Sequence, residues 1–292
     1  MRLLLTGAGG QLGTDIQKAA AGAELLPLTH DELDITDNAA VSKACRDFSP
    51  DVIVNTAAYV RVDDCETNRD GAYAVNALGA GNVAAAARET GAKLVHISTD
   101  YVFGGGETGL ERQLTEEDVP VPVNVYGASK LAGEEKVRQS WHRHFIVRSS
   151  GLFGVAGSSG KGGNFVETIL RLAVKCGALT VVKDQRLSPT YTHDLAAKIL
   201  ELVATDGYGI YHVTNSGTCS WYEFAGEILR LAGLKVKISP VTSEQYPRPA
   251  GRPRYSVLDN ACLRLLGRDN MRPWQDALAA YMAEREQGND EG

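Results

Sequence analysis

The chain has little of what defines several large classes of protein. Its five cysteines in 292 residues are scattered, odd in number and without a Cys-x-x-Cys pair, which indicates reduced thiols in a cytoplasmic protein. No apolar run approaches the roughly 20 residues of a membrane helix, and the apolar start at Leu3–Leu5 is too short for a signal peptide. A net charge of −6 disfavours general binding to nucleic acid or anionic membranes. We therefore expect a cytoplasmic globular protein with neither kind of partner.

Histidine is also scarce, and the six His residues suggest no metal site. His142 and His144 form a His-x-His pair, but no third ligand is evident nearby. The pair is better explained as the solvated start of a strand, so we expect no bound metal ion.

Short apolar runs alternate with helical patterns through the first 150 residues. Several runs are continuous, as in a parallel sheet that is buried on both faces. The expected strands are Leu3–Thr6, Glu24–Leu28, Val52–Asn55, Lys93–Ser98 and Phe145–Arg148. The expected helices are Gln11–Ala21, Asn38–Phe48, Asp70–Thr90 and Tyr126–Ser140. This rhythm predicts an α/β fold with a doubly wound, Rossmann-type parallel sheet, in a dinucleotide-binding domain of residues 1–150.

After residue 150 the rhythm loosens, which predicts that residues 151–292 form mainly a smaller C-terminal α/β substrate lobe. The lobe begins with a glycine-rich loop, Gly151–Gly163, and contains a proline-rich stretch, Pro240–Pro253, that cannot form regular helix. The other expected elements are helices Asn164–Cys176, His193–Ala204, Trp221–Ala232 and Trp274–Glu286 and strands Leu179–Val182 and Ile210–Val213. We expect the segments of about 179–214 to return to the main sheet.

The first candidate site is a glycine-rich turn between the first strand and the first helix. Gly7, Gly10 and Gly13 have the spacing Gly-x-x-Gly-x-x-Gly. Such a turn lets the backbone approach a diphosphate and directs the N–H groups of the helix start, here at Gln11 and Leu12, toward it. The turn predicts a dinucleotide site. The alternative is a glycine cluster that only packs a strand against a helix.

The end of the second strand leaves the choice of dinucleotide open. The acidic residue that usually binds the ribose 2′-hydroxyl is not obvious, because His30 stands there with Asp31 just beyond. His30 can tolerate or favour a 2′-phosphate, so NADH and NADPH are both retained as candidates. Asp34, next to Ile35, can accept from an adenine amino group or cap a helix, a role that Asp37 serves better.

Small and polar residues follow the third and fourth strands, at the same edge of the sheet. Ala57, Ala58 and Tyr59 follow the third strand and leave room for a ligand. Ser98–Tyr101 ends the fourth strand in two hydroxyls, a carboxylate and a phenol. These groups predict a site at this edge, and a simple Asx or Ser/Thr turn is the structural alternative.

Tyr126 and Lys130 are four residues apart on an expected helix, which puts a phenol and an ammonium on one face. A phenol with its ordinary pKa near ~10 is a poor proton donor or acceptor at neutral pH, and a fixed positive charge beside it lowers that pKa. Chance produces such a pair in many chains of this composition, so its meaning depends on the other sites.

Together, these features resemble the extended short-chain dehydrogenase/reductase superfamily, and more narrowly the dTDP-4-dehydrorhamnose reductase family. The resemblance spans nearly the whole chain. It is carried by Gly10–Gly13, Leu33–Asp37, Asp51–Tyr59, Ser98–Phe103, Asn124–Glu134 and Arg252-Pro253 with Ser256 and Leu258. The strings Ser-Thr-Asp-Tyr-Val-Phe and Tyr-Gly-x-Ser-Lys-x-x-Gly-Glu are the most specific.

The resemblance implies that NADH or NADPH gives a hydride to the C4 ketone of dTDP-4-dehydrorhamnose, which forms dTDP-L-rhamnose for cell-surface polysaccharide. It makes Tyr126 the proton donor. It implies that Lys130 lowers the pKa of Tyr126 and binds the nicotinamide ribose. Thr99 would donate a hydrogen bond to the ketone oxygen, and Asp100 would orient the sugar hydroxyls.

The diphosphate of such a substrate needs cationic partners. Arg248, Arg252 and Arg254 lie in the proline-rich stretch, and a guanidinium matches phosphate oxygens. Arg252 is the best candidate because it stands in the Arg-Pro pattern of the family, although each can equally be a surface arginine. Asn164 and Phe165 resemble another substrate-contacting pair.

Gly151 departs from the family pattern, which often has a tryptophan there that packs on the sugar. Either the sugar pocket is roomier, or an aromatic residue such as Phe153 or Tyr101 replaces the contact. A reductase of a different nucleotide-linked 4-ketosugar is therefore the first rival hypothesis.

The second rival is a non-catalytic nucleotide-binding protein that resembles the accessory subunit of methionine adenosyltransferase. The intact Thr99, Tyr126 and Lys130 argue against it. Some relatives are thought to bridge a dimer through a divalent ion, but no such acidic cluster is evident here. We expect a monomer or a homodimer.

Overall fold

The computed structural model of the protein describes residues 1–105, 112–157 and 163–290, with side chains described up to 287. Its centre is a six-stranded sheet in the order β10-β5-β4-β3-β1-β2, and all its strand pairs are parallel. The strands are β1 (Arg2–Thr6), β2 (Glu24–Leu28), β3 (Val52–Asn55), β4 (Lys93–Thr99), β5 (His144–Ser149) and β10 (Gly209–His212). This sheet confirms the predicted doubly wound α/β fold.

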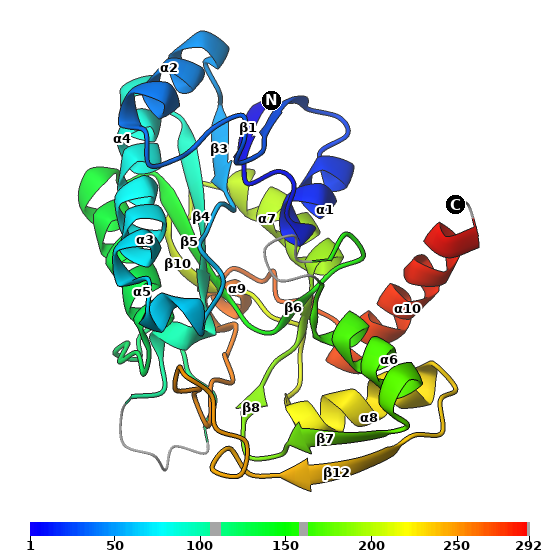
Figure 1. Cartoon of the computed structure of the whole chain (residues 1–292). Coiled ribbons are helices and arrows are strands. Elements are labelled where there is room, and N and C mark those ends of the chain that lie inside the picture. Colours follow the sequence, from blue (N-terminus) through cyan, green and yellow to red (C-terminus); the bar gives the residue numbers. More distant parts are fainter. Residues whose placement is uncertain (106–111, 158–162, 291–292) are drawn as a thin grey trace.

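Helices cover both faces of this sheet, as Figure 1 shows. They are α1 (Gln11–Ala19) and α7 (Thr192–Val203) on one side, and α2 (Asn38–Phe48), α3 (Arg69–Tyr73), α4 (Ala80–Thr90) and α5 (Val125–Ser140) on the other. Alternate strand residues serve the two layers: Leu3 and Leu5 pack with the α1/α7 side, and Leu4 packs with the α2/α4/α5 side. Burial on both faces explains why the strands read as continuous apolar runs.

The helix expected at Asp70–Thr90 is interrupted by a π-helical segment, Ala74–Gly79, between α3 and α4. Asn76 lies in this segment and is buried. Its side chain binds the backbone N–H and C=O of Tyr59 and the hydroxyl of Ser129 on α5, at 2.8, 3.1 and 3.0 Å. The π segment therefore joins the loop after β3 to α5, in line with the frequent use of such bulges near functional sites.

The smaller lobe packs around an aromatic core below the main sheet. Its helices are α6 (Phe165–Cys176), α8 (Trp221–Leu231) and α10 (Trp274–Asp290), whereas α9 (Ala261–Leu265) packs on the core of the main sheet beside β10. Its strands pair as β7 (Ala178–Val182) with β12 (Lys237–Val241), β6 (Leu152–Phe153) with β9 (Thr190–Tyr191), and β8 (Arg186–Leu187) with β11 (Cys219–Ser220). Of the segments expected to return to the main sheet, α7 and β10 do so and β7 does not. The domain boundary at residue 150 stays a prediction.

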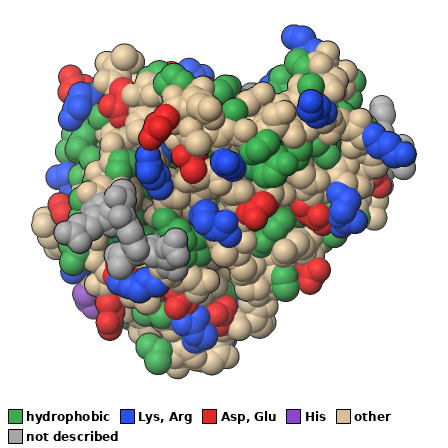
Figure 2. Space-filling model, turned by 90° about the horizontal axis from the view of Figure 1, so that it is seen from below, with side chains coloured by type: hydrophobic (Ala, Val, Ile, Leu, Met, Phe, Trp, Pro, Cys, Tyr) green, Lys and Arg blue, Asp and Glu red, His purple; other side chains and the backbone are tan. Residues whose placement is uncertain are grey.

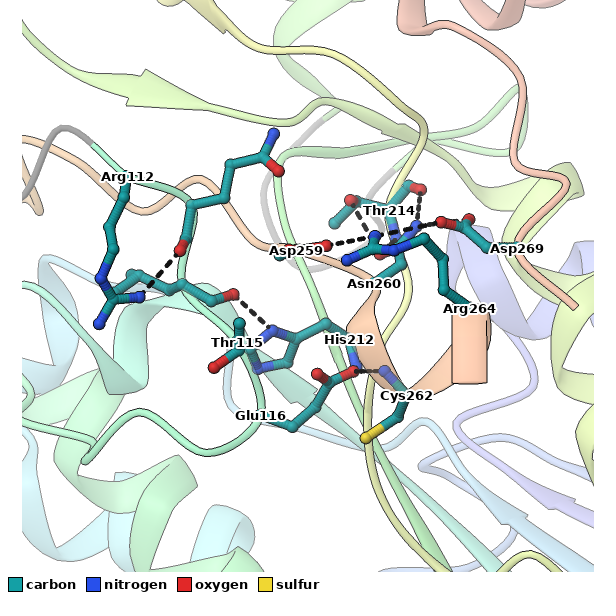
Figure 3. Close-up of polar contacts among 12 residues, drawn as sticks. Arg112, Thr115, Glu116, His212, Thr214, Asp259, Asn260, Cys262, Arg264 and Asp269 are labelled. Atoms are coloured by element: carbon teal, nitrogen blue, oxygen red, sulfur yellow. Dashed lines mark hydrogen bonds and ion pairs between the residues drawn. The ribbon is translucent and has the colours of Figure 1, made fainter. Parts of the chain in front are cut away.

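A polar cluster fixes residues 112–118 to the β10 edge of the sheet (Figure 3). The carboxylate of Glu116 accepts the backbone N–H of His212 on β10 at 2.9 Å and that of Cys262 on α9 at 3.2 Å. His212 Nδ1 lies 2.9 Å from the carbonyl of Leu114, and burial lowers the pKa of His212 to about 3, so the ring is neutral. The cluster therefore holds α9 and the chain before it against the main sheet.

Among the described residues, no helix is long and apolar enough to cross a membrane. Figure 2 looks at the molecule from below, where Lys and Arg side chains are interspersed with Asp and Glu. Charge of one sign does not dominate the described part of this face.

Candidate active site

A cleft of about 1220 Å³ opens at the carboxyl ends of the parallel strands and extends to the smaller lobe. This edge of a doubly wound sheet is where such folds bind ligands. The sequence-predicted site residues that line it are Gly7, Gly10, Gln11, Leu12, His30, Asp34, Ile35, Ala57, Ala58, Tyr59, Thr99, Asp100, Tyr101, Tyr126, Lys130, Gly151, Asn164 and Arg252. The structure brings these residues together, and their individual roles stay predictions.

The glycine-rich turn forms one end of the cleft. Gly7 has a φ of +72°, and a Cβ atom there would lie 2.7 Å from the backbone nitrogen of Ala57, so only glycine fits. Gly10 is the N-cap of α1, and no side chain caps this helix end. Gln11 leaves its Oε1 atom buried without a partner. The free N–H groups of the helix start and this cradle fit the diphosphate of a dinucleotide.

The end of β2 presents no carboxylate that is clearly committed to a ribose. Glu32 turns back, and its carboxylate accepts the backbone N–H and the hydroxyl of Thr29, both at 2.8 Å. Asp34 accepts the N–H of Thr36 at 2.9 Å, a bond that lowers the pKa of the Asp34 carboxyl. Asp37 caps α2, as expected, by accepting from Ala39 and Ala40. His30 is exposed at the cleft, so this end can meet a ribose with or without a 2′-phosphate.

Lys130 is 2% exposed and lies one helical turn after Tyr126 on α5. Its Nζ donates to the backbone carbonyl of Ile97 on β4 at 2.6 Å. Burial lowers the pKa of Lys130 to about 8, although the nearby carboxylate of Glu134 favours the charged form. A fraction of this ammonium therefore loses its proton near neutral pH.

In the free protein, the pKa of Tyr126 is set mainly by burial. Burial raises the pKa of this phenol above its ordinary value and the charge of Asp100 adds to the rise, while a hydrogen bond with Thr99 opposes it. Lys130 is engaged with the carbonyl of Ile97 and does not reverse the effect. The lowering of this pKa by Lys130 stays a prediction. The phenol is fully protonated at neutral pH, which is the form that a proton donor needs.

Asp100 is 3% exposed and forms a hub of hydroxyl contacts. Its carboxylate accepts from Ser256 at 2.6 Å, from Ser150 at 2.8 Å and from Thr99 at 3.1 Å. Burial raises the pKa of Asp100 to about 6, and these three bonds partly oppose the rise. Both carboxylate oxygens already have protein partners, so in the free protein Asp100 links the ends of β4 and β5 to the segment that contains Ser256. Its contact with sugar hydroxyls stays a prediction.

The backbone conformation explains why residue 151 is a glycine, which the sequence did not reveal. Its φ is +54°, and a Cβ atom would lie 2.6 Å from the Cδ1 atom of Leu187. Backbone conformation and this contact thus favour glycine at 151, and the suggestion of a roomier sugar pocket stays a prediction. Phe153 is fully buried in the lobe core and cannot replace the missing aromatic contact, whereas Tyr101 lines the cleft.

Two aromatic residues of the smaller lobe also line the cleft. The rings of Phe165 and Trp221, at the starts of α6 and α8, lie 4.5 Å apart. Asn164 caps α6 by accepting the N–H of Glu167 at 3.0 Å, and it donates to the carbonyl of Gly154 at 2.9 Å. Part of the expected glycine-rich loop, residues 158–162, lies outside the described residues.

The arginine-proline segment contributes two of its three candidate arginines to the cleft. Arg252 pairs with Asp63 at 3.0 Å and donates to the carbonyl of Ala250 at 2.8 Å. Arg248 lies over the ring of Tyr246 and also lines the cleft. Arg254 pairs with the exposed Glu244 and is not among the lining residues, so it is a surface arginine.

Several residues of the site were missed by the sequence. Arg186 lines the cleft but belongs to the two-residue strand β8, which has no distinctive pattern. Trp221 lines it as the first residue of α8, a helix that was predicted without any contact to the site. Ser150 directly follows β5, and the rule that ligand groups follow parallel strands could have identified it. Among the described residues, no group of three or more His, Cys, Asp or Glu side chains is arranged to hold a metal ion.

Comparisons with known proteins agree with this geometry. A family model described as the RmlD substrate binding domain matches residues 1–287. The chain is 44% identical to the spore coat polysaccharide biosynthesis protein SpsK of Bacillus subtilis, over 99% of each protein. It is 41% identical to a dTDP-4-dehydrorhamnose reductase of Mycobacterium tuberculosis, over 97% of this chain and 92% of that protein.

A solved structure gives the same result. The crystal structure of dTDP-4-dehydrorhamnose reductase from Bacillus anthracis in complex with NADP has a TM-score of 0.91 and 42% identity to this chain. The match covers 97% of this chain and 99% of that one. The chain therefore belongs to the RmlD substrate binding domain family, the family of the dTDP-4-dehydrorhamnose reductases.

Proposed function

We propose that the protein is an NAD(P)H-dependent oxidoreductase that reduces the C4 ketone of dTDP-4-dehydrorhamnose to dTDP-L-rhamnose, in nucleotide-sugar and polysaccharide biosynthesis. One observation carries the proposal most directly. Tyr126, Thr99 and the buried Lys130 line the same cleft as the glycine-rich turn, so a proton donor, a hydroxyl and an ammonium lie together next to a dinucleotide site. The names of the M. tuberculosis and B. anthracis relatives support the same reaction.

The chain's own residues have separable tasks in this reaction. When bound, the reduced nicotinamide supplies the hydride, so the protein must supply a proton, polarise the ketone and hold the geometry. Tyr126 is the proton donor, because its raised pKa keeps the phenol protonated. The hydroxyl of Thr99 donates to Asp100 in the free protein and turns to the ketone oxygen, where negative charge develops, when substrate binds. Lys130 binds the nicotinamide ribose and stabilises the tyrosinate that is left after proton transfer.

The two ligands occupy different parts of the cleft in this proposal. Cofactor binding is assigned to residues along the ends of β1 to β3 and on α5, namely Gly7, Gly10, Gln11, Leu12, His30, Asp34, Ile35, Ala57, Ala58, Tyr59, Tyr126 and Lys130. Substrate binding is assigned to Thr99, Asp100, Tyr101, Gly151, Asn164 and Arg252. Both NADH and NADPH are accepted, because no carboxylate at the end of β2 is committed to reject a 2′-phosphate. The protein acts in the cytoplasm as a monomer or homodimer.

The test is a reductase assay with a panel of substrates. The protein is incubated with NADH or NADPH and dTDP-4-dehydrorhamnose, other dTDP-4-ketosugars and ketosugars on other nucleotides, and nicotinamide absorbance is followed. Preferred turnover of dTDP-4-dehydrorhamnose supports the proposal. Preferred turnover of another ketosugar supports the first rival, and binding of nucleotide without any turnover supports a non-catalytic protein.

Replacement of Tyr126 by Phe tests the proton donor. The variant should bind cofactor with nearly unchanged affinity, and its turnover should be lower by roughly 10²-fold or more, the usual weight of a positioned acid. Wild-type turnover by Tyr126→Phe would contradict the mechanism while leaving the identity of the substrate intact.

A further inference from the structure

A short segment of the smaller lobe, residues 250–256, crosses to the main sheet and carries three lining residues of the cleft. Arg252, Pro253 and Ser256 line the cleft. The segment is fixed by two side chains of the larger domain near its start and by Asp100, through Ser256, near its end. How this segment is fixed therefore decides where Arg252 stands.

Asn124 provides the most direct of these attachments. This residue is 7% exposed and is the N-cap of α5, two residues before Tyr126. Its side-chain oxygen accepts the backbone N–H of Gly127 at 2.7 Å, and its side-chain nitrogen donates to the backbone carbonyl of Gly251 at 2.7 Å. One amide therefore binds the helix that carries the acid and the peptide that precedes Arg252.

Only an amide side chain can make both contacts at this position. A serine caps a helix equally well, but its hydroxyl is too short to cap the helix and also reach the carbonyl of the neighbouring segment. An aspartate caps a helix but offers no donor to a carbonyl oxygen when it is ionised. The choice of Asn124 is thus explained by the second contact and not by the cap alone.

Resting on the proposed function, in which Arg252 binds the substrate diphosphate, we propose that Asn124 is a positioning residue. By capping α5 and holding Gly251 with the same amide, it fixes the separation of the proton donor Tyr126 and the phosphate-binding Arg252. The ketone and the diphosphate of a nucleotide sugar lie at a fixed distance from each other, so a fixed separation of their protein partners lowers the cost of ordering on binding.

Neighbouring contacts keep the fold intact when Asn124 is changed. Glu66 accepts the backbone N–H of Val125, the first residue of α5, at 2.9 Å. Asp63 accepts the N–H of Ala250 at 3.2 Å and pairs with Arg252. Without the Asn124 contact, the start of the segment is held by Asp63, while its end keeps Ser256 and the backbone hydrogen bonds to Arg186. Arg252 therefore becomes less well placed while the helix persists.

The experiment compares Asn124→Ser, which keeps a neutral cap, with Asn124→Ala, which loses both contacts. KM for the nucleotide sugar should rise roughly tenfold in both variants, as expected for the loss of one buried hydrogen bond. The Kd for NADPH should change less than twofold, and kcat less than threefold. The melting temperature should fall clearly only in Asn124→Ala, because a lost cap is destabilising.

A matched control separates positioning from general loosening of α5. Val137 is fully buried at the far end of the same helix and is not a lining residue. Val137→Ala should lower the melting temperature at least as much as Asn124→Ala, with no change in KM for the nucleotide sugar. A tenfold rise of KM in this control would overturn the proposal, since any destabilisation of α5 would then be sufficient.

Other results would also overturn it. These are a wild-type KM for the nucleotide sugar in Asn124→Ser, or equal increases of KM for nucleotide sugar and cofactor. Failure of the proposed function is recognised separately, because the wild-type protein would then reduce none of the ketosugars. In that case, calorimetric titration with dTDP measures whether Asn124 still places Arg252 for diphosphate binding. A tenfold weaker affinity in Asn124→Ser supports the proposal, and an equal affinity, or none in the wild type, overturns it.

Discussion

Lys130 and Lys198 are both 2% exposed, and the structure predicts opposite effects on stability when each is replaced by methionine. Lys130 lies at the cleft, and the hydrogen bond to the Ile97 carbonyl is the contact that holds its ammonium. The Lys198 ammonium binds the carboxylate of Glu201 at 2.5 Å and two oxygen atoms of the chain near α9. One charge is poorly solvated by the protein, and the other is well solvated.

The cost of burying the Lys130 charge follows from the pKa. Burial lowers the pKa of Lys130 from 10.5 to about 8, which corresponds to about 3 kcal/mol of lost stability while the group is charged. Lys130→Met removes this cost and gives up one hydrogen bond, worth about 1 kcal/mol. Methionine has a similar length and is apolar. The variant should be about 2 kcal/mol more stable at pH 7, a rise of roughly 5 °C in melting temperature.

The advantage of Lys130→Met should depend on pH. The pKa of Lys130 is lower in the folded protein than in the unfolded chain. Between about pH 8 and 10.5 the unfolded chain keeps a proton that the folded protein has released, so the wild type gains stability as pH rises. The difference between variant and wild type should therefore shrink from about 2 kcal/mol at pH 7 to near zero at pH 9.5.

The measurement is urea unfolding of wild type, Lys130→Met and Lys198→Met at both pH values, together with reductase activity. Lys198→Met should be less stable than wild type by roughly 2 kcal/mol, because two carbonyl oxygens lose their donor, and it should remain active. Lys130→Met should lose most activity. If Lys130→Met is less stable than wild type at pH 7, or its advantage does not fall with pH, the reasoning about the buried charge is wrong.

Two further predictions concern Arg252 and Asp100. Arg252→Ala should raise KM for the nucleotide sugar roughly tenfold or more with little effect on cofactor binding. The surface variant Arg254→Ala should leave both quantities unchanged. Steady-state kinetics measure both variants, and equal effects of the two would remove Arg252 from the substrate site. The pKa of Asp100 is raised to about 6, so between about pH 4 and 6 the folded protein holds a proton that the unfolded chain has released, and wild-type stability falls as pH rises. Asp100→Asn lacks this dependence and should gain about 2.4 kcal/mol relative to wild type from pH 4 to pH 7. A constant difference in urea unfolding across this range would contradict the shift.

The fold was predictable for segments whose structure follows from their own residue pattern and does not depend on contacts with distant parts of the chain. The strand β3 was predicted with its observed bounds, Val52–Asn55, because a strand that is buried on both faces must be apolar throughout. The π segment Ala74–Gly79 was not, since its residues favour an ordinary helix. The bulge depends on Asn76 reaching Tyr59 and Ser129, which are distant in sequence. β12 was also missed, because Pro240 is tolerated in a strand that has a single partner, β7.

The same distinction explains the candidate site. The ends of parallel strands meet at one edge, so Thr99 and the glycine turn could be grouped from the strand order alone. The direction of the Tyr126 pKa could not be found this way, because it depends on how deeply the phenol is buried and on Asp100 beside it. The role of Gly151 depends on its backbone angle and on Leu187, neither of which a motif reveals.

Several charged side chains are buried around the end of β4, and their arrangement is explained by the proposed catalysis. Lys130 donates to the carbonyl of Ile97, Glu134 accepts from Ser98, and Asp100 accepts from Thr99, so consecutive residues of one strand each contact an ionisable group. The carboxylate of Glu134 forms an ion pair with the guanidinium of the buried Arg148, with Nη2 and Oε2 2.6 Å apart. Replacing such a buried pair by apolar residues is often neutral or stabilising, so stability does not explain it. The carboxylate of Glu134 favours the charged form of Lys130, one helical turn away, and thereby limits the fall of its pKa. The strand end therefore carries charges whose burial lowers stability, and one of them, the carboxylate of Glu134, helps to keep Lys130 protonated near neutral pH.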